Sequence, residues 1–208
     1  MEIYPAGLRP GGGNIMTEID HWNYFLAIED DLERLSRFVE FDRKNFETFS
    51  IEISRILLAA AAEVDVVCKQ ICKKLNPSST AKNINAYHDE ICLNYPAIPD
   101  FEVVLIRYSL NLLPWEKWKN PKDDPPDWWT AYNKLKHNRH TEYHRANLKN
   151  ALNSVAGLFV MVLYLYKEKA TQGELRPSPH LLQVSFKNHF GGTSMGGYHA
   201  CFSTHYKL

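Results

Sequence analysis

The sequence predicts a mainly α-helical protein, folded as one bundle of four or more helices. Apolar residues recur every three or four positions over long stretches, which is the period of an amphipathic helix. The chain has 208 residues, of which 45% are hydrophobic, enough for a single domain with its own core. Its 24 basic and 24 acidic residues cancel. Binding of nucleic acid would therefore need a local basic patch rather than a global positive field.

Five segments carry the helical pattern. The predicted helices cover residues 21–41, 46–75, 84–93, 128–137 and 142–169. Thr17 or Asp20 is expected to cap the first, and Asn76-Pro77 ends the second because proline lacks the backbone donor that a helix needs. The apolar run 155–166 is well short of the roughly 20 residues that span a bilayer. It therefore predicts a buried helix and no membrane association.

The remaining segments are expected to be loops and short β structure. Residues 101–113 are rich in Val, Ile and Leu and predict a strand or an extended arm, and the proline-rich residues 114–127 predict a loop. The tail has two β-prone pieces, 182–186 and 198–202, which form a hairpin or are partly disordered. The predicted organisation is a flexible leader (1–16), a helical domain (17–172) and a C-terminal tail (173–208). Four tryptophans near the loop form a ligand pocket or, as we favour, a buried lid: Trp115, Trp118, Trp128 and Trp129.

The cysteines and the N-terminal residues indicate the compartment. Cys68 and Cys72 lie one helical turn apart on an apolar face, where buried free thiols are common, and there is no CxxC spacing. Residues 1–16 lack the basic start and apolar core of a signal peptide. We expect a reducing, cytoplasmic location.

The strongest local positive bias lies at residues 134–149, which contain five Lys or Arg residues and three histidines. Glu142 is the one acidic residue in this stretch. Tyr132 and Tyr143 flank it, together with Trp128 and Trp129, and aromatic rings of this kind can stack on bases. The alternative is a solvated helix junction whose cations favour the dipole at the helix C-terminus.

Arg139 and His144 are the candidate catalytic pair. A guanidinium presents a planar fork to phosphate, and an imidazole can accept or donate a proton near neutral pH. Together they suffice for metal-free RNA cleavage, in which the base deprotonates a ribose 2′-hydroxyl and the cation stabilises the charge on phosphorus. On a straight helix the two side chains would point about 140° apart. We therefore expect a break, with Arg139 ending one element and His144 starting the next.

This block resembles the motif of the HEPN superfamily, in which an arginine and a following polar residue, here His140, precede a histidine by a few positions. The preceding Tyr-Asn-x-x-Lys-His-x-Arg segment and the Ala- and Leu-rich final helix are also similar. The resemblance implies an up-and-down bundle that dimerises, so that two copies of Arg139 and His144 share a cleft, and an endoribonuclease of phage-defence or toxin–antitoxin systems. It assigns phosphate binding to Arg139 and acid–base chemistry to His144. Asn133 and Lys136 would position the RNA backbone, and His137 is a second candidate base.

Other functions stay open alongside this one. A catalytically inactive HEPN-like module would bind nucleic acid, nucleotide or a protein partner such as an antitoxin, and His144 would then be a structural residue capping the last helix. His140 and His144 have the spacing of two zinc ligands on a helix, but no third ligand is evident. The sequence accordingly predicts neither a metal nor a cofactor.

Overall fold

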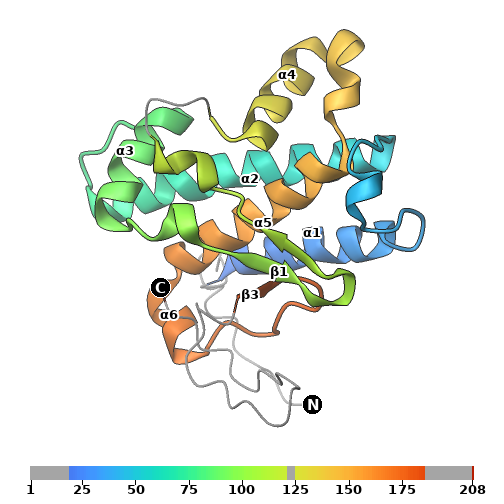
Figure 1. Cartoon of the computed structure of the whole chain (residues 1–208). Coiled ribbons are helices and arrows are strands. Elements are labelled where there is room, and N and C mark those ends of the chain that lie inside the picture. The colour runs from blue at the N-terminus through green and yellow to red at the C-terminus, as the bar shows by residue number, and fades with distance from the viewer. Residues whose placement is uncertain (1–18, 121–124, 186–207) are drawn as a thin grey trace, which may run out of the picture.

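The computed structural model describes residues 19–120, 125–185 and 208. This part of the chain is mainly helical with a small sheet, which confirms the predicted bundle with a small β arm (Figure 1). The predicted leader (1–16), Thr17 and the β-prone piece 198–202 lie outside the described residues. The α-helices are α1 (Asp20–Leu35), α2 (Ile51–Leu75), α3 (Ile84–Asn94), α4 (Asp127–Glu142), α5 (Leu148–Leu165) and α6 (Lys167–Gln172).

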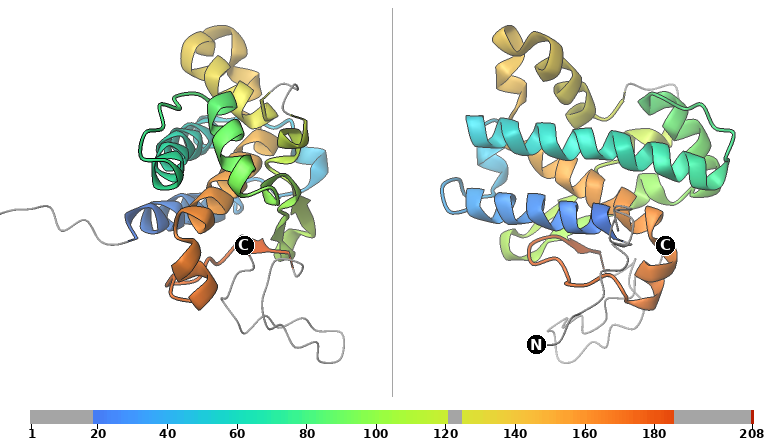
Figure 2. Two further views of the ribbon diagram at one scale, coloured as in Figure 1. Left: turned by 90° about the vertical axis from the view of Figure 1, so that its left-hand side faces the viewer. Right: turned by 180° about the vertical axis from the view of Figure 1, so that it is seen from behind.

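Helix α5 is the centre of the core. It lies between a layer formed by α1 and α2 and, on its other side, the β arm (Figure 2). Its packing against α2 is the most extensive in the fold. By length and composition α5 would be apolar enough to cross a membrane, but 83% of the residues in that window are buried inside the protein. Its apolar surface is therefore already covered by neighbouring elements, as expected for a buried core helix.

The first two long helices are shorter than predicted. Helix α2 begins at Ile51 rather than residue 46, because the Ser50 hydroxyl accepts a hydrogen bond from the Ile53 amide at 3.2 Å and caps it. It ends at Leu75, directly before Asn76-Pro77, as predicted. Helix α1 ends at Leu35 rather than residue 41, and its N-cap is Ile19, which makes no side-chain cap. Asp20, an expected cap, is instead the first helical residue.

The predicted arm is a β-hairpin that the tail completes. Strands β1 (Val103–Leu105) and β2 (Leu110–Leu112) pair antiparallel, and β3 (Gln183–Val184) adds to the other side of β1, giving the order β2-β1-β3. Ser109, at a φ of 52°, adopts the left-handed conformation that turns the chain into β2. The β-prone piece predicted at 182–186 therefore pairs with the arm through Gln183 and Val184, and its last residue lies outside the described part of the chain. Leu181, Leu182 and Val184 are buried, so the start of the tail packs onto the helical domain.

The four tryptophans are buried, as expected for a lid over the bundle. The indole N–H of Trp115 donates to the Gly157 carbonyl at 3.2 Å, and that of Trp128 donates to the Pro114 carbonyl at 2.8 Å. A Cβ at Gly157 would lie only 3.0 Å from the Trp128 ring. Glycine at this position of α5 thus permits the close approach that brings the start of α4 against the core.

The expected buried thiols are also present. Cys68 and Cys72 are free and buried on α2. Burial raises the pKa of the Cys72 thiol to about 12, so this group is protonated at neutral pH.

Candidate functional site: the basic block at the end of α4

The basic block, residues 134–149, lies mostly on the part of the chain that projects from the bundle (Figure 1). The first half of α4 is anchored by four buried residues: Trp128, Trp129, Ala131 and Leu135. Beyond Leu135, residues 136–141 are all exposed. Asn138 has non-helical angles (φ −133°, ψ 40°), so α4 is kinked one residue before Arg139. Packing therefore fixes the base of α4, while its far end presents its side chains to solvent.

The final helix starts later than the sequence predicted. Residues Tyr143–Arg145 form a 3₁₀ turn, η5, and α5 begins only at Leu148. Asn147 causes this, because its side chain accepts a hydrogen bond from the Asn150 amide at 3.0 Å and caps the helix. The same asparagine donates to the Glu47 carboxylate at 2.8 Å, and its backbone forms a β-bridge with Phe49. The prediction of a helix from residue 142 was wrong for this reason.

Arg139 is exposed and lies over an aromatic ring. Its guanidinium carbon is 5.4 Å from the centroid of the Tyr143 ring, a cation–π contact. Tyr143 in turn meets Phe49 edge to face, with centroids 5.6 Å apart. No carboxylate among the described residues pairs with Arg139. Arg139 therefore stacks on Tyr143, while its hydrogen-bond donors have no partner among the described residues.

His144 is exposed in η5, one residue after Tyr143. It caps neither α4 nor α5, since the cap of α5 is Asn147. Glu142 is hydrogen-bonded to Arg145, and this bond, with the nearby Lys134 and His144, lowers the pKa of the Glu142 carboxyl. The one acidic group in the block is thus engaged by Arg145.

The expected break between Arg139 and His144 is present, but not at residues 138–141, between the two predicted helices. The kink at Asn138 precedes Arg139, and a second departure from helical geometry at Glu142 (φ −108°, ψ 13°) precedes η5. Arg139 therefore stands in the last turn of α4, and His144 in a short turn of its own. His140 and His144 lie on these two different elements rather than on one helix face, so the zinc-ligand spacing of a straight helix does not apply.

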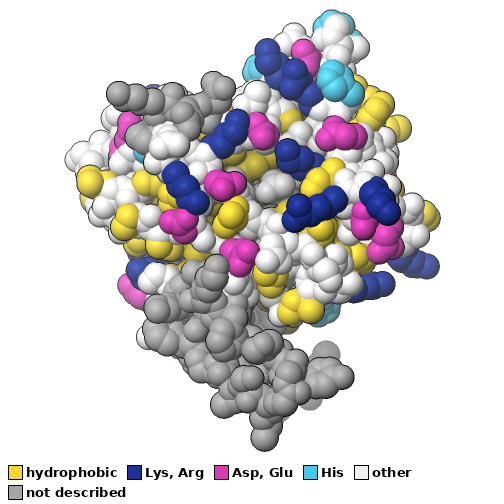
Figure 3. All heavy atoms as spheres, viewed as in Figure 1, with side chains coloured by type: hydrophobic (Ala, Val, Ile, Leu, Met, Phe, Trp, Pro, Cys, Tyr) yellow, Lys and Arg dark blue, Asp and Glu magenta, His cyan; other side chains and the backbone are white. Residues whose placement is uncertain are grey.

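The supporting candidates are all exposed. They are Asn133, Lys136, His137 and His140. Lys136 lies 5.7 Å from the centroid of the Tyr132 ring. Figure 3 shows Lys, Arg and His side chains on the projecting end of the molecule, and further Lys and Arg side chains across the rest of this face. The structure thus places all six predicted site residues on one exposed projection, anchored at its base by buried tryptophans.

A polar groove that the sequence did not reveal lies at the base of α4. Its volume is about 420 Å³, and neither Arg139 nor His144 lines it. It is formed by the arm, the start of α4, the loop before α2 and the first turns of α5. Cationic and amide side chains line it, together with carboxylates and Trp128: Arg43, Lys117, Lys149, Asn111, Asn150, Asn153, Glu102, Glu116 and Asp127. These residues come from separate segments, so no local motif marks them.

Comparison with protein-family models, curated proteins and solved structures gives no match to this chain. The resemblance of residues 128–166 to the HEPN superfamily therefore stays a prediction.

Proposed function

We propose that the protein is a metal-independent endoribonuclease of the HEPN type, acting through Arg139 and His144. One observation supports this most. An exposed guanidinium lies over the Tyr143 ring, an exposed imidazole follows on the next residue, and no described carboxylate forms an ion pair with either of them. A solvated helix junction would show the same charge, but it would not explain why Arg139 is held by an aromatic ring while its donors stay unpaired.

The chemistry follows from these two groups. Arg139 binds a backbone phosphate through its N–H donors. Neutral His144 takes the proton from the ribose 2′-hydroxyl, whose oxygen attacks the adjacent phosphorus. The bond from phosphorus to the 5′-oxygen breaks, and that oxygen takes a proton from an acid, the imidazolium of a second copy of the chain. The products are a 2′,3′-cyclic phosphate and a 5′-hydroxyl.

Dimerisation is the first testable consequence. Phe49 and Ile51 are 48% and 62% exposed, and Phe49 lies against Tyr143 next to the proposed site. Apolar side chains left in water beside a basic projection suit a surface that a second copy covers. We expect light scattering at micromolar concentration to give roughly twice the 24.1 kDa mass of one chain.

Charge substitution tests where the two copies meet. Ile51→Glu places a charge in the expected interface, yet it is compatible with the first turn of α2, where the helix dipole favours an acid. It should convert the dimer to monomer and abolish cleavage together. Leu93→Glu is the matched control, since Leu93 is 83% exposed on α3, and it should leave the mass unchanged. A wild-type protein that is monomeric throughout this range would contradict the shared site.

Independence from metal is the second consequence. Glu142, the one acid in residues 134–149, is bound to Arg145, so this block offers no carboxylate cluster for magnesium. We expect excess EDTA to leave the cleavage rate of single-stranded RNA within about twofold, because proton transfer and phosphate binding need only side chains. Loss of cleavage in EDTA that magnesium or manganese restores would rule out this mechanism.

The groove at the base of α4 favours a second candidate, a catalytically inactive module that binds a nucleotide or nucleic acid. Among the described residues, Arg43 and Lys149 form no ion pair and line this groove beside three asparagines. These two cations can bind a phosphate group, although Glu102, Glu116 and Asp127, the last of which pairs with Lys117, also line the groove. Under this alternative the chain binds RNA or nucleotide but does not cleave, and the charge of the basic block matters more than the identity of its residues.

A further inference from the structure

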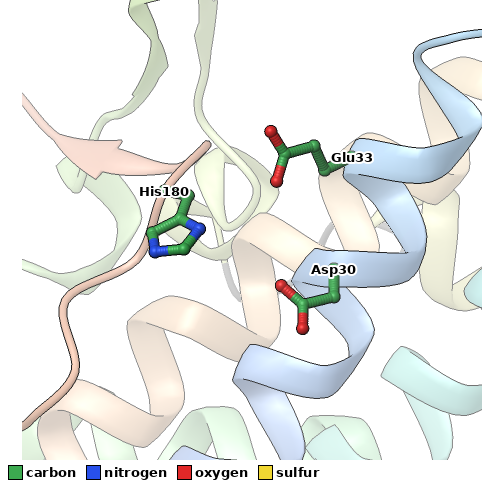
Figure 4. Close-up of side chains that lie close together, drawn as sticks. All are labelled: Asp30, Glu33 and His180. Atoms are coloured by element: carbon green, nitrogen blue, oxygen red, sulfur yellow. The ribbon is translucent and has the colours of Figure 1, made fainter.

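Three side chains outside the basic block converge on one point (Figure 4). Asp30 and Glu33 are one helical turn apart on α1 and point to the same side. His180 comes from the segment after α6, about 150 residues later in the chain. One potential ligand atom from each residue lies within 4.8 Å of the other two.

Hydrogen bonds to the backbone hold His180 at this point. Glu29, which is 2% exposed on α1, accepts a hydrogen bond from the His180 amide at 2.9 Å. It also accepts the amides of Leu181 and Leu182 at 2.9 and 2.8 Å. On the N-terminal side, the Trp22 indole N–H donates to the Pro177 carbonyl at 3.1 Å. These hydrogen bonds fix the backbone on both sides of His180, so its imidazole stays close to the two carboxylates.

Neither of these two carboxylates has a direct side-chain partner. Among the described residues no ion pair involves Asp30 or Glu33, and no hydrogen bond involves their carboxylates. Both carboxylates point toward the imidazole and have oxygen atoms free to bind an ion (Figure 4). A groove of about 460 Å³, lined also by Arg34, Arg37 and Arg107, opens both carboxylates to solvent.

We propose that Asp30, Glu33 and His180 bind one divalent transition-metal ion, with zinc the best fit. One imidazole nitrogen and two carboxylate oxygens match the ligands of zinc, at bond lengths of about 2.0–2.2 Å. Ligands at that distance around a tetrahedral ion are roughly 3.4 Å apart, so small side-chain rotations close the site. Magnesium and calcium prefer sets made only of oxygen and bind more weakly here. The ion joins α1 to the segment that carries β3, and it lies outside the basic block.

The test is zinc binding by the full chain after its metal has been removed. Calorimetry measures the number of bound ions and their affinity, and a thermal melt measures the change in the midpoint, Tm. Wild type should bind one more zinc ion than His180→Ala or Asp30→Asn. Zinc at about a hundred times its Kd should raise the wild-type Tm by roughly 5–10 °C, an effect absent in both variants and with magnesium. Asp31→Asn is the matched control on α1 and should bind zinc as wild type does, because Asp31 pairs with Arg34 and lies outside the cluster.

Counting ions relative to wild type separates this site from the other histidines of the chain. Glu33→Gln is a further variant, which keeps the backbone of α1 and the size of the side chain. With cobalt(II) as the probe, wild type should show the visible absorption of a bound ion, and Glu33→Gln should lose it. Equal zinc stoichiometry and affinity in wild type, His180→Ala and Glu33→Gln would overturn the proposal, whether or not the protein cleaves RNA.

Discussion

Replacing His144 with alanine should slow cleavage of single-stranded RNA by about 10²–10⁴-fold, the usual contribution of a positioned general acid or base. The fold should be unaffected, because His144 is exposed in η5 and caps neither α4 nor α5. Cleavage of a mixed RNA pool gives the rate, and circular dichroism with a thermal melt confirms that the variant is folded.

Arg139→Lys separates catalysis from simple charge. The ammonium keeps the positive charge but cannot make the bidentate phosphate contact, so the endoribonuclease should lose most of its activity. The inactive module predicts the opposite result, RNA binding that lysine largely preserves. Arg55→Lys is the matched control, since Arg55 is exposed on α2 and pairs with Glu52. It should behave as wild type in both assays.

Each outcome assigns the function differently. If wild type cleaves RNA and His144→Ala cleaves it equally fast, the catalytic assignment is wrong. His137, exposed on the same projection, is then the next base to test. If wild type binds RNA without cleaving it, the groove at the base of α4 becomes the site to examine.

The sequence predicts the helices well where one face of a long segment is buried. The stripe on α2 and its proline stop identify that helix, and the apolar run at residues 155–166 marks α5 as the core helix. Helix starts were less predictable, because they depend on capping. Ser50 and Asn147 each accept a backbone amide three residues later, and this moves the start of α2 and α5 to the following residue.

The exposed site residues were visible in the sequence because they are close together in it. Charge and aromatic spacing in residues 128–149 mark the block without knowledge of the fold. The groove and the cluster of Asp30, Glu33 and His180 could not be found this way, because their residues come from distant segments. Only tertiary contacts bring these residues together. One of them is the hydrogen bond that Glu29 accepts from the amide of Leu182, 153 positions later in the chain.

Glu29 itself should be among the residues most important for stability. Glu29→Ala leaves three amides without their acceptor and opens a space beside buried Leu181 and Leu182. We expect it to reduce the free energy of unfolding by about 3 kcal/mol, measured in urea, and to increase hydrogen exchange at those amides. Asp31→Ala on the same helix is the control and should change stability by less than about 0.5 kcal/mol. A Glu29→Ala variant as stable as this control would contradict the role of the buried carboxylate.

The contribution of Glu29 should also depend on pH in a defined direction. Burial raises the pKa of this carboxyl above its ordinary value, although the three amide donors and the nearby His180 oppose the shift. The folded state therefore holds the proton at a pH where the unfolded chain has released it, and wild type loses stability as pH rises. This loss of stability begins near pH 4.5, the ordinary pKa of a glutamate, and is complete above the raised pKa of Glu29. Glu29→Gln has no such titration. The free energy of unfolding of wild type, relative to Glu29→Gln, should therefore be highest at mildly acidic pH and fall toward neutrality. A relative stability that instead grows with pH would show that the amide hydrogen bonds outweigh burial.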